Sequence, residues 1–386
     1  MASSRRPPVN TWLSRRQSPT DGLPSWILNV MDTGWTERLL GEPPGNYWAD
    51  PEGFVARQYQ RLGTAFCDQF ITQDPAMGRE GWRVERSRGP LVRDGMVIDS
   101  PEAVCEHLEH FVWPVLERQI ADFAAARPDL QARFVAEMRA LQERLGPDIA
   151  AVPYSQPQAK PVLRYGDYGY ENYFMFYALY PEVAERSFRL EADYAELHNA
   201  AMAQVMFAEG YPPVVRVDHD ITDSRGTLAS MESMEERYLP HYARALRPLV
   251  ERGVRLLYHC DGNVNPLVPW LLEIGFAGFQ GFQYEDGVDY PTIARMSTRE
   301  GEPLTLIVGA SVTTTLVHGT PEDVRREIDW LVENSADASL ALGATSSICP
   351  GTPGENLDAL VESMQHYQEH GKAGLRRKVG KRRAWG

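Results

Sequence analysis

From about residue 150 the chain alternates between short apolar runs, rich in branched side chains, and longer stretches of helical period. We predict strands at the apolar runs, over residues 149–153, 213–220, 254–260, 278–284, 304–310 and 338–344. Helical patterns lie between them, over residues 181–210, 230–253 and 320–336. Pro240 and Pro248 are expected to kink or split the second of these helices. Fully apolar strands that alternate with helices are typical of a parallel sheet covered by helices.

The alternation favours a closed barrel over an open sheet. An open nucleotide-binding sheet carries G-x-G-x-x-G after an early strand, and none of the early strands here is followed by that motif. Barrels of alternating strands and helices also reach the length of this chain, 386 residues, as one unit. We therefore predict a single (β/α)8 TIM barrel of the α/β class. Extra N-terminal helices, over about residues 101–126 and 128–145, are expected to pack against it.

Composition limits the classes of function. The barrel is expected over residues 26–370, between a flexible arm at residues 1–25 and a basic disordered tail at residues 371–386. A net charge of −14 argues against a nucleic-acid-binding surface. No apolar run approaches the roughly 20 residues of a membrane-spanning helix. The four cysteines form no C-x-x-C pair, which favours a reducing compartment, so we expect a cytoplasmic protein with a small-molecule substrate.

Polar side chains stand at the ends of the predicted strands. In chain order they are Asp218, His219 and Asp220; His259 and Asp261; Gln283 and Glu285; Ser311; and, beyond the last strand, Cys349. The carboxyl ends of parallel barrel strands share one rim, where barrel enzymes place their active sites. Titratable groups that converge there can shift one another's pKa and hold a metal. The set therefore indicates an active site on this rim.

Each of these residues also has a structural interpretation. A strand-end aspartate such as Asp220 can cap the following helix. His219 can be an ordinary hydrogen-bonded rim histidine. Cys260 and Cys349 can be small buried apolar residues, which is the usual role of a free cysteine. The functional interpretation depends on the whole set, because chance does not readily gather His, Asp, Glu and Cys on one rim.

Residues from about 205 to 370 resemble the uroporphyrinogen decarboxylase superfamily, which includes zinc-dependent methyltransferases that work with corrinoid proteins. The resemblance is carried by VDHDITDSRGTLASMESMEERYLPHYARAL, LYHCDGNVNPLVPWLLEIGFAGFQGFQ, LTLIVGASVTTTLVHGTPEDVRREI and ICPGTPGENLDALVESM. It implies a single β/α barrel, in agreement with the strand pattern.

The resemblance is closer to the methyltransferase branch than to true uroporphyrinogen decarboxylases. The decarboxylases carry an N-terminal Arg-Gln-Ala-Gly-Arg loop whose cations bind the substrate carboxylates. The nearest string here is SRRQSPTDG, which has Arg15, Arg16 and Gln17 without Ala-Gly-Arg. A porphyrinogen with many carboxylates needs several positioned cations, so decarboxylation of a tetrapyrrole is disfavoured.

The methyltransferase branch has His-x-Cys followed much later by another Cys, and both cysteines bind zinc. By this resemblance the zinc ligands would be His259, Asp261 in place of the first cysteine, and Cys349, with Glu285 as a further candidate. His259 and Asp261 are two positions apart, so at a strand end both point to the same face. A carboxylate in place of a thiolate leaves a more Lewis-acidic centre, which is better suited to oxygen or nitrogen ligands.

We predict Asp218, His219 and Asp220 as catalytic residues that act as a general base or orient the substrate. The predicted substrate-binding residues are Tyr165, Tyr168, Tyr170, Gln283 and Ser311. The three tyrosines surround two glycines in RYGDYGYENYFMFYALY, a loop that would suit a flat ligand.

The predicted activity is zinc-dependent methyl transfer or demethylation of a small oxygen-, nitrogen- or sulfur-bearing substrate, with a corrinoid protein as partner. Two alternatives stay open: a metal-free decarboxylase or lyase of a carboxylated, tetrapyrrole-like substrate, and a binding subunit without catalysis. The oligomeric state is also open, with a homodimer as one alternative.

Overall fold

The computed structural model describes residues 17–73 and 91–376. A five-stranded parallel sheet forms one half of the barrel, in the order β11-β10-β9-β8-β5. Its strands are β5 (Val214–Asp218), β8 (Arg255–His259), β9 (Phe276–Gln280), β10 (Thr305–Ala310) and β11 (Ser339–Ala344). Asp218 is paired with His259, and His259 with Gln280, so the carboxyl ends of three neighbouring strands are level.

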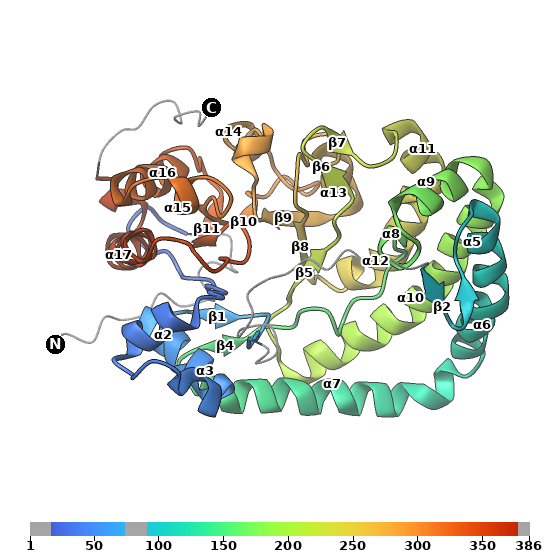
Figure 1. The fold of residues 1–386 in the computed structure, drawn as a ribbon, viewed down its shortest axis with the longest axis horizontal. Coiled ribbons are helices and arrows are strands. Elements are labelled where there is room, and N and C mark those ends of the chain that lie inside the picture. The colour runs from blue at the N-terminus through green and yellow to red at the C-terminus, as the bar shows by residue number, and fades with distance from the viewer. Residues whose placement is uncertain (1–16, 74–90, 377–386) are drawn as a thin grey trace.

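Shorter segments form the other half. The two-residue strand β1 (Phe66–Cys67) pairs in parallel with β4 (Ala150–Ala151). Residues 24–30 lie between β11 and β1, because the Trp26 amide donates to the Leu342 carbonyl at 2.8 Å and the Ala65 amide donates to the Ser25 carbonyl at 2.8 Å. The described residues thus supply eight parallel segments, and the predicted TIM barrel is confirmed (Figure 1).

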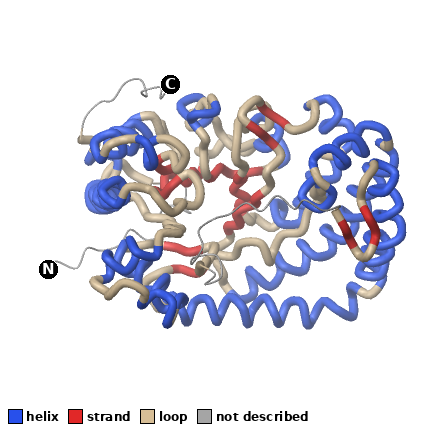
Figure 2. Tube along the Cα trace, viewed as in Figure 1, coloured by secondary structure: helices blue, strands red, loops and turns tan. Residues whose placement is uncertain are grey.

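Helices cover the outside of the sheet (Figure 2). The helices of this half of the chain are α10 (Pro181–Glu209), α11 (Met231–Arg237), α12 (Leu239–Glu251), α13 (Val268–Ile274), α14 (Tyr290–Ile293), α15 (Thr315–His318), α16 (Pro321–Glu333) and α17 (Gly354–His370). Of these, α12 packs on β8, α13 on β9 and α16 on β10. The predicted split in the second helix falls at Tyr238, and Pro240 lies in the first turn of α12, where its missing N–H costs no bond. Helix α16 begins with a capping box in which Thr320 and Asp323 bond each other's backbone amides.

The N-terminal half adds further elements. They are α2 (Thr33–Leu40), η1 (Asn46–Ala49), α3 (Pro51–Leu62), α5 (Pro101–His107), η2 (Leu108–Val112), α6 (Trp113–Ala121), α7 (Phe123–Leu145), α8 (Tyr165–Tyr168) and α9 (Tyr170–Leu179). Two hairpins, β2 (Val92–Arg93) with β3 (Met96–Val97) and β6 (Thr222–Asp223) with β7 (Gly226–Thr227), and two short turns, η3 (Tyr284–Asp286) and η4 (Lys372–Gly374), complete the fold. Helix α7 packs against α10, α3 and β4, so the extra helices belong to the barrel unit.

The structure corrects the predicted boundaries at both ends. Residues 1–16 and 377–386 of the predicted arm and tail lie outside the described residues. Gln17, however, exchanges two hydrogen bonds with the backbone of Leu340, and Leu23 is fully buried. At the other end Lys372 donates to the carbonyls of Ala336 and Ala338. Residues 17–25 and 371–376 therefore pack on the barrel and are neither a free arm nor a disordered tail.

One strand was placed too late in the chain. The prediction was residues 278–284, whereas β9 spans Phe276–Gln280. Gly281 has a positive φ of 69° and turns the chain out of the sheet. Phe282 beyond it is still fully buried, so apolarity alone does not mark where this strand ends. Within residues 17–73 and 91–376, the structure contains no helix with the length and apolar composition of a membrane span.

Candidate functional site

A cavity of about 210 Å³ opens at the carboxyl ends of β5, β8 and β9. The polar side chains on its wall include Arg216, Asp218, Asp220, His259, Asp261 and Gln280. Residues of the opposite half-barrel, among them Trp26 and Gln69, complete it. The cavity therefore lies on the rim that the sequence predicts for the active site.

Three of these side chains form a candidate metal centre. Asp220, His259 and Asp261 each offer one ligand atom, and the three atoms lie within 4.8 Å of one another. The Nε2 atom of His259 is 3.9 Å from Oδ1 of Asp261. We call these three residues the rim triad. One imidazole and two carboxylates are donors that a divalent cation such as Zn²⁺ accepts.

The backbone of the next strand fixes the orientation of His259. Its Nδ1 donates to the Gln280 carbonyl oxygen at 3.1 Å, so Nε2 is the ring nitrogen that faces the cavity and could bind a metal. A Cβ at Gly281 would lie 2.7 Å from Nδ1 of His259 and 2.4 Å from the Thr345 carbonyl oxygen. Glycine at this position makes room for the imidazole.

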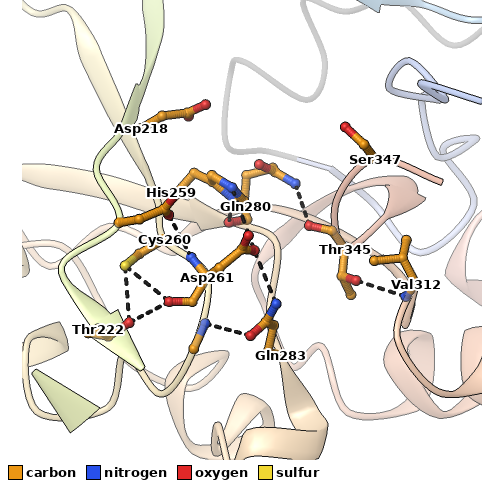
Figure 3. Close-up of polar contacts among 12 residues, drawn as sticks. Asp218, Thr222, His259, Cys260, Asp261, Gln280, Gln283, Val312, Thr345 and Ser347 are labelled. Carbon is orange, nitrogen blue, oxygen red and sulfur yellow. Dashed lines mark hydrogen bonds and ion pairs between the residues drawn. The ribbon is translucent and has the colours of Figure 1, made fainter. Parts of the chain in front are cut away.

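Hydrogen bonds from the loops fix the two carboxylates, and those of Asp261 with Gln283 can be followed in Figure 3. The Asp261 amide donates to Oδ1 of Asp220 at 2.9 Å. Gln283 donates from Nε2 to Oδ1 of Asp261 at 3.1 Å, and its own Oε1 accepts from the Gly262 amide at 2.6 Å. Burial raises the pKa of Asp261; the nearby carboxylates of Asp220, Asp218 and Glu285 raise it further, and His259 lowers it. The cluster thus carries excess negative charge that a bound cation would relieve.

Cys260 faces away from the cavity and joins the two loops that carry the carboxylates. Its Sγ accepts from the Ile221 amide at 3.3 Å and lies 3.1 Å from Oγ1 of Thr222. The same hydroxyl donates to the Asp261 carbonyl at 2.6 Å. Burial raises the pKa of Cys260 to about 11, so the thiol stays protonated. Cys260 therefore holds the loops and is not a ligand (Figure 3).

The chain matches the uroporphyrinogen decarboxylase (URO-D) family over residues 169–367. It belongs to this family. A solved structure of a methyltransferase from Methanosarcina mazei is similar, with a TM-score of 0.57 and 18% sequence identity, over 93% of this chain and 97% of that chain. At this identity the likeness is one of fold. A comparison with curated proteins finds no match.

This URO-D family member carries a second charged cluster in the same cavity, which we call the Arg216 cluster. Arg216 donates to Oδ2 of Asp68 at 2.7 Å and to both carboxylate oxygens of Asp218 at 2.6 and 2.8 Å. It also donates to Gln280 at 3.3 Å, and Tyr154 donates its hydroxyl to Asp218. Two carboxylates thus neutralise one guanidinium that is only 3% exposed. Asp218 is an anchored carboxylate, in contrast to those of the rim triad.

Sequence reasoning missed Arg216 and its partner Asp68. An arginine in the middle of the apolar run VVRVD is the signal that could have found them, because a charge inside a barrel strand needs a buried partner. The partner itself lies 148 positions away in the chain. A pairing between residues so far apart in the chain cannot be inferred from a single sequence.

His219 lies outside the cavity, although it was predicted as catalytic. Nε2 accepts from the Leu163 amide at 3.4 Å, so Nδ1 carries the proton and donates to the Tyr238 hydroxyl at 2.9 Å. Burial and the charge of Lys160 lower the pKa of His219 well below its usual value. Successive strand residues point to opposite faces, so next to the inward-facing Asp218 this imidazole points into the helical layer. It is a structural histidine.

The predicted ligand set is only partly brought together. His259 and Asp261 meet as expected, but the described residue Cys349 is exposed and lies outside the triad. Glu285 also lies outside it: Oε1 of Glu285 accepts from Ser311 at 2.8 Å and from Thr313. Asp220, which was predicted as catalytic, stands in the triad instead.

The predicted substrate-binding residues lie in different places. Tyr168 is 1% exposed and 3.0 Å from Nδ1 of His107, so it is part of the core. Gln283 orients Asp261 and Ser311 orients Glu285. Tyr165 donates its hydroxyl to the Asp220 carbonyl and packs against the exposed ring of Tyr170, with ring centroids 4.6 Å apart. Tyr165 thus contacts a triad residue, and Tyr170 presents an exposed ring beside it.

Proposed function

We propose that this URO-D family member is a metal-dependent methyltransferase that acts on a small substrate with its methyl group on oxygen or nitrogen. The observation that supports the proposal is the rim triad of Asp220, His259 and Asp261, whose ligand atoms lie within 4.8 Å at the carboxyl ends of two adjacent strands. The likeness in fold to a methyltransferase over almost the whole chain adds support.

The donor set determines the kind of metal centre. The triad offers one nitrogen and two carboxylate oxygens, and no thiolate belongs to it. Zinc accepts these donors, and a centre without thiolates is a harder Lewis acid that favours oxygen and nitrogen over sulfur. When bound, the metal would polarise the heteroatom that carries the methyl group. The methyl acceptor in this proposal is a corrinoid protein.

The remaining wall of the cavity would position the substrate. Asp218 is held in one orientation by Arg216 and Tyr154, so it is well suited to accept a hydrogen bond from the substrate. Gln280 is fixed between Arg216 and the Thr345 carbonyl, to which it donates at 3.3 Å. These fixed polar groups can orient a small substrate beside the triad with little reorganisation.

The cavity gives the alternative, decarboxylation of a tetrapyrrole, little support. At about 210 Å³ it lies below the 300–1,000 Å³ typical of drug-sized ligands. Among the described residues that line the cavity, Arg216 is the one arginine or lysine. Asp68 and Asp218 already neutralise its charge. A substrate with several carboxylates would also meet Asp220 and Asp261, which repel it.

Metal analysis of two matched variants tests the ligand set. We expect the purified protein to bind about one equivalent of Zn²⁺, Asp220→Asn to lose most of this affinity, and Cys349→Ser to keep it. Metal content by plasma mass spectrometry and affinity by competition with a chelating dye provide the measurement. Loss of zinc in Cys349→Ser with retention in Asp220→Asn would overturn the triad in favour of a cysteine-containing site.

Activity is tested with matched methyl donors. Methyl transfer to reduced free cobalamin, followed by visible absorbance, compares an O-methyl, an N-methyl and an S-methyl compound of similar size. We expect transfer from the oxygen or nitrogen donors, at least tenfold faster than from sulfur, and loss of transfer after metal removal. Faster transfer from the thioether, or transfer that survives metal removal, contradicts the proposal.

A further inference from the structure

A second cavity lies next to the first, and the loop that follows β5 contributes to the walls of both. It has a volume of about 650 Å³, within the range of sites for drug-sized ligands. Tyr170 and Phe174 of α9 line one side of it. The hairpin of β6 and β7 lines the other side, with Thr222, Thr227 and the neighbouring Leu228.

The α8–α9 side of this cavity is a cluster of three aromatic rings. The ring centroids of Tyr165 and Tyr170 are 4.6 Å apart, those of Tyr165 and Phe174 are 5.9 Å apart, and those of Tyr170 and Phe174 are 6.1 Å apart. The Tyr165 and Phe174 rings are stacked, with 19° between their planes. Tyr170 is nevertheless 60% exposed. A ring cluster with an open face is suited to stacking another flat ring upon it.

The loop that follows β5 connects this cavity to the rim triad. Asp220 lines the first cavity and Thr222 lines the second. Two residues of extended backbone span no more than about 7 Å. Tyr165 strengthens the connection, because its hydroxyl donates to the Asp220 carbonyl while its ring packs against Tyr170. The two cavities therefore share the segment Asp220–Thr222 as part of their walls, and Tyr165 joins the ring cluster to a residue of the triad.

The polar groups at the mouth give little charge selectivity. Arg225 at the tip of the hairpin forms an ion pair with Asp223 at 2.8 Å, so these two charges at the mouth of the second cavity cancel. The Thr222 hydroxyl is engaged by the Asp261 carbonyl. The walls that remain are aromatic rings, Leu228 and the methyl groups of threonines, which suit an uncharged flat body.

We propose that the second cavity binds a planar aromatic body of the substrate, while the first cavity receives the reactive methyl-bearing end. The assignment of the methyl-bearing end to the first cavity rests on the proposed function, whereas the aromatic binding site does not. This assignment also agrees with the volumes of the two cavities, because the first is too small for a drug-sized molecule and the second is large enough.

Binding of a flat probe and its puckered counterpart tests the aromatic site. The probes are 2-naphthol and decahydro-2-naphthol, titrated into the zinc-loaded full-length protein and followed by saturation-transfer NMR. We expect 2-naphthol to bind at least tenfold more tightly than the saturated alcohol. Tyr170→Ala should weaken 2-naphthol about tenfold and Tyr170→Phe should leave it within twofold, because the ring and not the hydroxyl supplies the contact.

Phe207→Ala is the matched control, since Phe207 is an exposed aromatic side chain of α10, 47% exposed and outside the cavity. Unchanged binding in Tyr170→Ala, an equal loss in Phe207→Ala, or equal affinity for the two alcohols would each overturn the aromatic site. His259→Ala separates the two proposals: 2-naphthol binding that persists without zinc leaves the aromatic site standing. Zinc that persists in Tyr170→Ala leaves the triad standing.

Discussion

Two histidines stand next to each other on the barrel rim, and their surroundings differ. His219 follows β5 and His259 ends β8, and the His219 amide donates to the His259 carbonyl at 3.0 Å. Around His219, both ring nitrogens are satisfied by Leu163 and Tyr238 in the helical layer. Around His259, one nitrogen is satisfied by Gln280 and the other faces Asp261 across the cavity.

The difference teaches that hydrogen-bond satisfaction separates a structural residue from a candidate ligand better than position does. Both histidines end predicted strands, and both are less than 10% exposed. The same contrast separates the carboxylates: Asp218 is neutralised in the Arg216 cluster, whereas the carboxylate of Asp220 raises the pKa of Asp261 and His259 is the group that opposes it. The following predictions test whether this contrast holds in solution.

The largest expected effect is on metal binding. His259→Ala removes the only nitrogen ligand of the triad, so we expect zinc affinity to fall by more than about a hundredfold. The unfolding midpoint of the metal-free variant should fall only modestly, because the ring makes one hydrogen bond to a buried group, the Gln280 carbonyl, and its other nitrogen faces a cavity. Zinc titration and urea unfolding of the same samples measure the two quantities. If His259→Ala kept its zinc, His259 would not be a metal ligand, and the contrast with His219 would fail.

His219→Ala should show the opposite pattern. The substitution leaves the Leu163 amide and the Tyr238 hydroxyl without their buried partner and opens a void, so the free energy of unfolding should fall by about 3 kcal/mol. Zinc stoichiometry should stay at one. Urea unfolding of the metal-free protein measures the loss. Normal stability together with lost zinc would assign the ligand role to His219.

A smaller effect is expected from the residue that orients Asp261. Gln283→Ala removes the hydrogen bond to Oδ1 of Asp261, and loss of such a supporting contact typically costs about 10- to 100-fold in metal affinity. Gln69→Ala is the control, because Gln69 lines the same cavity but binds Arg216 at 3.1 Å. Zinc affinities that fall equally in both variants would indicate a general loosening of the cavity.

The smallest effect concerns pH and a histidine far from the rim. Burial lowers the pKa of His198 on α10, and Nδ1 of this residue lies 3.1 Å from Oδ1 of Asn199. As pH falls below about 6.5 the unfolded chain takes up a proton that the folded chain does not, so the protein loses stability. His198→Gln should make this decline between pH 7 and 5 shallower, and urea unfolding at the two pH values measures the change. A variant with the parent's slope would exclude His198 as its origin.

The sequence predicted the barrel because its strand–helix alternation is regular after residue 150. It was less informative before that point, where β1 has only two residues and residues 24–30 join the barrel through isolated bridges. Hydrophobic pattern cannot reveal such short segments, because their pairing is decided by tertiary contacts.

The site was predicted in part for a similar reason. His259 and Asp261 share a face by strand alternation, which the sequence does show. Asp220 replaces Cys349 in the triad because the loop after β5 folds back onto Cys260, a contact between positions 39 apart. His219 was grouped with Asp218 because the two are adjacent in the sequence, but strand alternation turns adjacent side chains to opposite faces, and both ring nitrogens of His219 bond in the helical layer.

The barrel closes between two segments that lie far apart in the chain, residues 17–30 and β11, and we call this junction the seam. Gln17 and Leu340 bond each other across 323 positions, and Trp26 bonds Leu342 beside them. A nascent chain on the ribosome therefore cannot seal this seam until β11 has emerged. Until then the edges of the N-terminal segment and of β10 stay open to wrong partners, which makes late closure and dependence on chaperones the expected course of biosynthesis.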